Sequence, residues 1–232
     1  MNWSQPPRPA ELTEQRLLQA VLNGEFPPGS TLPGERELAA QLGVTRPTLR
    51  EALQRLARDG WFDIQHGKPT RVRDYWREGN LNVLSALVRH SQRLPDDFVP
   101  NLLAVRQSLA PAYTRAAVER GADQVIALLN GYADLQDRDS AERFATADWK
   151  LHHGLTLASG NPVFTLILNG FADFYVHMAC RYFSQPQARS ASRTWYADLL
   201  AAARAGDAGT AEHTTRRAMQ QSIDLWYALN GG

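Results

Sequence analysis

The apolar residues near the start of the chain recur at helical spacing. Between Glu11 and Asn23, leucine and valine return every three or four positions, which predicts an amphipathic helix. Residues 24–34 are rich in proline and glycine and predict a loop. The helical spacing then returns, and two shorter helices are expected at residues 35–42 and 45–58, with a two-residue turn between them.

Beyond these helices the spacing changes to the alternation that is typical of strands. Phe62 and Ile64, and later Thr70 and Val72, predict two short strands joined at the tip His66-Gly67-Lys68. Three helices followed by such a hairpin are the element order of a winged helix-turn-helix.

From Leu81 to Leu229 only helical periodicity is found. Stretches rich in proline, glycine and polar residues interrupt it and predict six or seven helices with short connections. The breaks fall at residues 93–97, 119–123, 159–162, 184–187 and 204–209. The predicted fold class is therefore mainly α, with an N-terminal winged helix-turn-helix and a C-terminal all-α bundle. The expected domains are residues 1–74 for DNA binding, 75–80 as a linker, and 81–232 as an all-helical regulatory domain.

Composition narrows the class of protein. A chain of 232 residues with 44% hydrophobic and 21% charged residues has the balance of a globular protein. The single Cys180 excludes a disulfide framework, and neither a signal peptide nor an apolar run of membrane-spanning length is found. We expect a cytoplasmic protein without a membrane partner.

The net charge of +1 hides a local excess of positive charge. Between residues 36 and 73 there are eight basic and four acidic residues. Thr45 is a good N-cap for the third helix, and Arg46, Thr48 and Arg50 remain at its exposed start. Arginines at the start of a recognition helix contact guanines in the major groove, so this segment predicts a DNA-reading helix.

The hairpin is the second candidate DNA contact. Gly67 allows close approach of the backbone, and His66 and Lys68 can reach a neighbouring minor groove or its phosphates. The alternative is that these charges form an ordinary solvated surface. That alternative leaves unexplained why a cap, a short turn, a basic helix start and a basic hairpin tip follow in this order.

The stretch "FPPGSTLPGERELAAQLGVTRPTLREALQRLARDGWFDIQHGKPTRV" resembles the winged-helix domain of the GntR family of bacterial transcription factors. "IQHGKPT", "LHHGLTLASGNPVFTLILNGF" and "RYFSQPQARS" resemble the fatty-acid-responsive branch of that family, so the resemblance covers most of the chain. It implies DNA contacts from Arg36, Thr45, Arg46, Thr48, Arg50, His66, Gly67 and Lys68. Pro47 departs from this branch, which carries threonine there, and we expect a shift in operator preference.

A metal site is the first hypothesis for the helical domain. Asp148 and His152 are four residues apart on one helical face. In the FCD effector domains that this domain resembles, such a pair joins two further histidines around a divalent metal. Tyr196 and Ala218 stand at the corresponding positions, so no metal is expected and the pair is interpreted as a contact within a packed bundle.

An apolar ligand is the second hypothesis. Residues 161–183 are apolar nearly all round and predict a buried helix, either as plain core or as a cavity wall. The family resemblance favours a cavity for the acyl chain of a long-chain acyl-CoA, lined by Arg106, Tyr175, Tyr182, Ser222 and Trp226. Ala218 and Met219 replace the tyrosine and glycine of better-known members, and a bulky Met219 is expected to alter the approach of the ligand.

These observations together predict a homodimeric transcription factor on a palindromic DNA operator, and the family resemblance implies that long-chain acyl-CoA releases it. The resemblance implies repression of fatty-acid degradation genes and activation of unsaturated-fatty-acid synthesis genes. The alternative is a regulator of the same family that responds to another small metabolite, such as a carboxylate. A structural DNA-binding protein is a further rival. An enzyme is disfavoured because neither a Gly-rich phosphate loop nor a nucleophile elbow is found, and no cofactor is expected.

Overall fold

The computed structural model describes residues 8–91 and 94–230. The ends of the predicted domains at residues 1–7 and 231–232, and residues 92–93 at the start of the first predicted helix break, lie outside the described residues. Contacts divide the chain between Leu94 and Pro95 into two compact units, each of which is described by itself.

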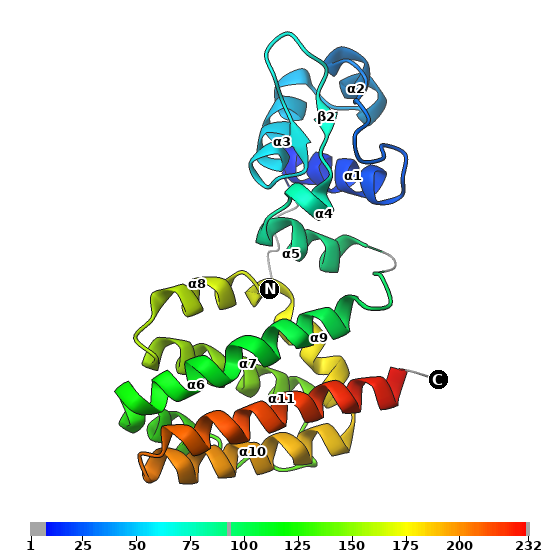
Figure 1. Cartoon of the computed structure of the whole chain (residues 1–232). Coiled ribbons are helices and arrows are strands. Elements are labelled where there is room, and N and C mark those ends of the chain that lie inside the picture. Colours follow the sequence, from blue (N-terminus) through cyan, green and yellow to red (C-terminus); the bar gives the residue numbers. More distant parts are fainter. Residues whose placement is uncertain (1–7, 92–93, 231–232) are drawn as a thin grey trace, which may run out of the picture. The chain divides into compact units, whose positions relative to one another are not determined.

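The first unit is a winged helix. It contains α1 (Pro9–Leu22), α2 (Glu35–Leu42), α3 (Arg46–Arg58), β1 (Phe62–Asp63) and β2 (Arg71–Val72) (Figure 1). The two strands pair antiparallel, and the loop between them is the wing. The predicted helices and hairpin are thus confirmed, with boundaries that differ by no more than a few residues.

The segment that was predicted as a plain loop contributes to this small sheet. The Val72 N–H donates to the Ser30 carbonyl and the Leu32 N–H donates to the Thr70 carbonyl, each over 2.8 Å. Thr31 and Arg71 form a bridge beside β2. The second strand of the wing is therefore paired with β1 on one side and with the segment around Thr31 on the other. This pairing fixes the direction in which the wing tip extends.

The predicted linker at residues 75–80 is instead structured. Most of it forms the single turn α4 (Tyr75–Glu78), and the next helix, α5 (Leu81–His90), buries Val83, Ala86 and Leu87 in the same core as Leu49 and Trp61. The first unit consequently continues beyond the linker predicted from composition, because α5 has an apolar face that this core covers.

The second unit is entirely helical in its described part, as predicted. Its helices are α6 (Phe98–Asn130), α7 (Ala141–Ala158), α8 (Pro162–Asn169), α9 (Ala172–Phe183), α10 (Pro186–Arg204) and α11 (Ala208–Asn230). The long α11 packs against α6 and α10, and α7 packs against α6 and α9 (Figure 1). Side chains from α7 and α10 fill the centre, where Phe144, Leu151, Leu155 and Leu199 are fully buried.

Two helix breaks differ from the prediction. At residues 119–123 the helix α6 continues, with a local kink at Gly121 (φ −147°, ψ 41°). The apolar stretch 161–183 forms two helices bent by 78° rather than one. Its first half, α8, is less buried than predicted, since Leu166 is 68% exposed. Among the described residues no single helix is long and apolar enough to cross a membrane. The bent pair α8–α9 has sufficient length and apolar composition when its two helices are taken together.

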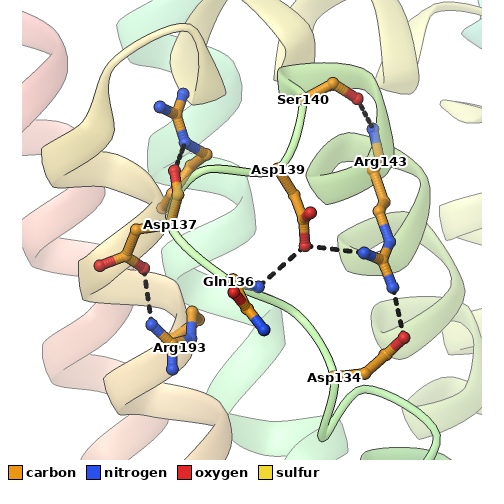
Figure 2. Close-up of polar contacts among 8 residues, drawn as sticks. Asp134, Gln136, Asp137, Asp139, Ser140, Arg143 and Arg193 are labelled. Carbon is orange, nitrogen blue, oxygen red and sulfur yellow. Dashed lines mark hydrogen bonds and ion pairs between the residues drawn. The ribbon is translucent and has the colours of Figure 1, made fainter.

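The connection from α6 to α7 was not predicted, and ion pairs hold it in place. Arg143 on α7 binds Asp139 over 2.8 Å and Asp134 over 2.6 Å. Asp137 binds Arg193 on α10 over 2.9 Å (Figure 2). The Ser140 hydroxyl accepts the Arg143 backbone N–H and caps α7. Polar side chains thus attach this loop to two helices of the bundle.

Candidate functional site

The start of α3 is built as the sequence predicts. The Thr45 hydroxyl accepts the Thr48 backbone N–H over 3.3 Å and lies 2.8 Å from the Thr48 hydroxyl. Leu49 is fully buried, which fixes the rotation of the helix about its axis. Arg46 and Arg50 consequently extend from the exposed face. This arrangement presents two guanidinium groups and a helix N-terminus to an incoming phosphate backbone.

Ion pairs hold two of the α3 arginines, which the sequence did not indicate. Arg50 binds Glu35 at the start of α2 over 2.6 Å, with side chains that are 59% and 34% exposed. Arg55 binds Glu14 on α1 over 3.1 Å and Glu51 over 2.6 Å. Arg55 therefore ties α3 to α1, whereas the exposed Arg50 can exchange its carboxylate for a phosphate at little cost.

The wing tip is exposed. Gly67 has a left-handed φ of +74°, which a residue with a side chain adopts only with strain. The Lys68 ammonium donates to the Gln65 side-chain carbonyl over 2.9 Å. His66, Lys68 and, at the start of α2, Arg36 have exposed side chains. A hollow of about 690 Å³ lies between α3 and the wing, and Arg50, His66, Gly67 and Lys68 are among the residues that line it.

The helical unit contains a partly open apolar cavity of about 110 Å³ between α6, α8, α9 and α11. All five residues predicted to contact a ligand lie on its wall: Arg106, Tyr175, Tyr182, Ser222 and Trp226. Most of the remaining wall is aliphatic or phenylalanine, with Tyr113 as a further polar residue. An arginine on such a wall suits a ligand with an apolar body and one anionic or carbonyl end.

Arg106 belongs to a buried polar cluster. One of its terminal nitrogens, Nη2, donates to Asp148 Oδ2 over 2.9 Å. The Tyr175 hydroxyl donates to the same oxygen over 2.6 Å, and the Tyr196 hydroxyl donates to Oδ1 over 3.0 Å. Burial is the largest influence and raises the pKa of the Asp148 carboxyl group, but the neighbouring charge of Arg106, the contact with His152 and the two tyrosine hydroxyls together outweigh it, so the pKa lies below its usual value. The cluster is an ionised pair inside an apolar domain.

His152 completes the cluster. Its Nε2 lies 2.5 Å from Nη2 of Arg106, and its Nδ1 lies 2.5 Å from the Tyr113 hydroxyl. Burial, together with the positive charge of Arg106, lowers the pKa of His152 to about 3, so its ring is neutral at pH 7. The contact predicted between Asp148 and His152 is present, with 3.8 Å between Oδ1 and Nε2, but Arg106 lies against both.

The positions compared with metal ligands hold other groups. Tyr196 uses its hydroxyl on Asp148, as described above, and Ala218 lines a small hollow beside the cavity. Within the described residues, no group of three His, Cys, Asp or Glu side chains is placed to hold a metal ion. The residues present do not fit a divalent metal, because the cation beside Asp148 is the Arg106 guanidinium.

Met219 lies beside the cavity and not on its wall. It is buried, and its carbonyl accepts the Ser222 hydroxyl over 2.7 Å. Together with Trp195 it lines the same small hollow, which shares Arg106, Tyr182 and Ser222 with the main cavity. Its side chain thus fills space next to the three residues that border both hollows.

Tyr113 was not predicted from the sequence as a site residue. A signal was present, since Arg106 and Tyr113 are seven residues apart and share one face of a helix. The part that Tyr196 plays had no local signal, because it comes from α10, 48 residues beyond Asp148.

A basic winged helix joined to a separate helical domain defines the class of DNA-binding transcriptional regulators. Residues 9–72 match the gntR family of bacterial regulatory proteins, and residues 73–231 match the FadR C-terminal domain. The chain therefore belongs to the GntR family of regulators and carries a FadR-type helical domain.

Similar proteins agree with this assignment. The chain is 40% identical over 221 residues to the "Fatty acid metabolism regulator protein" of Klebsiella pneumoniae strain MGH 78578, covering 95% of this chain and 92% of the relative. It is also 40% identical over 224 residues, with the same coverage, to the protein of that name from Escherichia coli strain K12 / DH10B. The solved structure of Lar from Listeria monocytogenes has a TM-score of 0.64 at 16% identity, covers 97% of this chain and 100% of its own, and shows the shared fold.

Proposed function

We propose that this protein regulates genes of fatty-acid metabolism by binding a palindromic operator as a homodimer, and that long-chain acyl-CoA releases it. The observation that carries the proposal is the cavity, because five residues expected from the sequence line one apolar hollow in a FadR-type domain. The names of the two relatives supply the metabolic context. Repression of degradation genes and activation of unsaturated-fatty-acid synthesis genes belong to the same proposal.

In this proposal the operator is read by the start of α3 and the wing tip. Arg46 is the best candidate for a base contact, since it is exposed and has no ion-pair partner in the described part of the chain, whereas Arg50 is paired with Glu35. Arg36, Thr45, Thr48, Arg50 and the wing residues His66, Gly67 and Lys68 position the protein on the phosphates. Phosphate contacts fix register, and base contacts supply sequence preference.

Substitution of Arg46 tests this assignment. A binding site is first selected from random duplex DNA, and affinity for the selected site and for scrambled DNA is then measured by fluorescence anisotropy. Arg46→Ala is expected to weaken specific binding by about 1–3 kcal/mol and to relax base preference at one position of each half-site. Arg58→Ala, an exposed arginine at the other end of α3, is the matched control. Equal weakening on both DNAs would make Arg46 a phosphate anchor instead.

The size of the cavity suggests how a ligand acts. An engineered cavity of about 150 Å³ holds a benzene molecule, so a hollow of about 110 Å³ is too small for a long acyl chain. Entry of the chain must therefore displace α6, α8, α9 or α11. In this proposal the ligand binds the wider state and the operator binds the closed state. Each therefore weakens the binding of the other by the same factor.

Calorimetric titration with oleoyl-CoA tests the effector. Binding heat together with loss of operator affinity is expected, and Trp226→Ala should blunt release while leaving operator affinity unchanged. Tyr227→Ala is the matched control because Tyr227 follows Trp226 on α11 and is 55% exposed. Absence of heat and unchanged operator affinity would exclude acyl-CoA as the effector.

The small volume also favours a second candidate. A carboxylate smaller than benzene, such as propionate, needs far less space than a long acyl chain and would pair with Arg106. Titration with propionate separates the candidates, because the carboxylate hypothesis predicts binding of the free acid and the acyl-CoA hypothesis predicts preference for the thioester. Under either hypothesis the protein acts as a cytoplasmic regulator and not as an enzyme, and sedimentation with and without operator DNA tests the homodimer.

A further inference from the structure

The hydrogen-bond pattern around His152 determines which of its nitrogens carries the proton. The Arg106 guanidinium only donates hydrogen bonds, so Nε2 of His152, which lies 2.5 Å from it, must accept. A neutral imidazole has one N–H, which is therefore on Nδ1. The opposite tautomer would place two N–H groups against each other at this short distance.

This tautomer in turn fixes the direction of the Tyr113 hydroxyl. Nδ1–H of His152 donates to the Tyr113 oxygen, so the phenolic proton of Tyr113 must go elsewhere. Among the described residues no acceptor for that proton is found. Tyr113 is 4% exposed and lines the apolar cavity. A buried donor without an acceptor costs free energy that a ligand oxygen would recover.

Other unpaired donors lie on the same wall. Arg106 Nε is buried and has no hydrogen-bond partner. The Tyr182 hydroxyl has no acceptor in the described part of the chain, whereas the Ser222 hydroxyl is already used on the Met219 carbonyl. Each of the polar groups that remain available has a proton to donate, and the ligand group that complements all of them is an acceptor such as a carbonyl or carboxylate oxygen.

We propose that Tyr113, oriented by His152, is a ligand-reading residue whose hydroxyl donates to the carbonyl oxygen at the head of the acyl chain. This inference rests on the proposed acyl-CoA function and adds a residue to it. Arg106 and Tyr113 lie two turns apart on one face of α6 and are joined through His152, so both donors lie on the same helix face. Together they distinguish an acyl group from a plain hydrocarbon.

A pair of ligands that differ only in the carbonyl tests the proposal. Palmitoyl-CoA has a thioester carbonyl, and S-hexadecyl-CoA, a thioether, lacks it. Wild-type protein is expected to prefer the thioester, and Tyr113→Phe is expected to reduce that preference by about three- to tenfold through weaker thioester binding. Thioether affinity should stay within about twofold, which separates a lost hydrogen bond from a damaged fold.

Tyr196→Phe is the matched control, because it removes an equally buried hydroxyl that also belongs to the cluster but does not line the cavity. Its ratio of thioester to thioether affinity should equal that of the wild type. If both ligands bind and the ratio of thioester to thioether affinity is the same in wild type and in Tyr113→Phe, the proposed role of Tyr113 is wrong but the acyl-CoA function is not. Failure of wild-type protein to bind either ligand would overturn the acyl-CoA function and this inference with it.

Discussion

Loss of the Asp148 charge should destabilise the helical unit strongly. The Asp148 side chain is 1% exposed and that of Arg106 is 20% exposed, so each charge has little water to replace its partner. Asp148→Asn keeps the shape and an acceptor oxygen but leaves the Arg106 cation without a counter-charge. Breaking a buried pair from one side costs about 3–5 kcal/mol, and the residual exposure of Arg106 places the expected loss near the lower end, at about 3 kcal/mol.

Urea unfolding of the full chain, followed by tryptophan fluorescence and far-UV circular dichroism, measures this loss. With a denaturant slope of about 2 kcal/mol per molar, the midpoint for the helical unit should fall by about 1.5 M. Asp137→Asn is the matched control: its ion pair with Arg193 is also short, at 2.9 Å, but both side chains are 44% exposed. That exposed pair should contribute less than about 1 kcal/mol.

A second substitution separates charge from packing. Arg106→Met in the Asp148→Asn background removes the cation, and it should restore at least half of the lost free energy of unfolding, since apolar replacement of a buried pair is often neutral. The reasoning fails if Asp148→Asn costs less than about 1 kcal/mol, or if the double variant is no more stable than the single one.

Three further predictions concern the folded state. Leu49→Ala removes a fully buried side chain from the winged-helix core, so its free energy of unfolding should fall by about 2–5 kcal/mol; a loss below 1 kcal/mol would contradict the packing of α3. Thr45→Ala removes the cap of α3 and should cost about 0.5–2 kcal/mol in the same assay, with Thr45→Ser restoring most of it. For His152, burial lowers the pKa from 6.5 to about 3. Between these two values the unfolded chain binds a proton that the folded chain does not bind. The free energy of unfolding should therefore decrease as the pH is lowered below 6.5, by up to about 1.4 kcal/mol per pH unit. His152→Phe should lack this part of the slope between pH 7 and pH 5, and identical slopes would show that His152 titrates normally.

The sequence predicted those elements whose signals are local. Apolar spacing and an N-cap specify α3, and the alternation around Phe62 and Val72 specifies the wing strands. The pairing of Ser30 and Leu32 with β2 was missed because backbone hydrogen bonds between distant segments leave no periodic pattern. The bend after Asn169 was missed because apolar residues continue through it without a change of composition.

The candidate site shows the same division. Arg106 and Trp226 came from family resemblance, and the structure brings both to one cavity from α6 and α11. The tautomer of His152 could not be predicted, because it depends on a contact between residues 46 positions apart. Hydrogen-bond directions depend on tertiary geometry, whereas residue identity at a matched position does not.

The buried cluster is difficult to explain as a contribution to stability. An apolar set of side chains in place of Arg106 and Asp148 would be at least as stable, because the desolvation of two charges offsets much of their attraction. Arg106 moreover has a buried Nε without a partner, and Tyr113 has a proton without an acceptor in the described structure. Sites that violate the rules of stable packing in this way are where function is expected. The unpaired donors lie on the wall of the apolar cavity, which supports the proposal that the cluster binds an acceptor oxygen of a ligand.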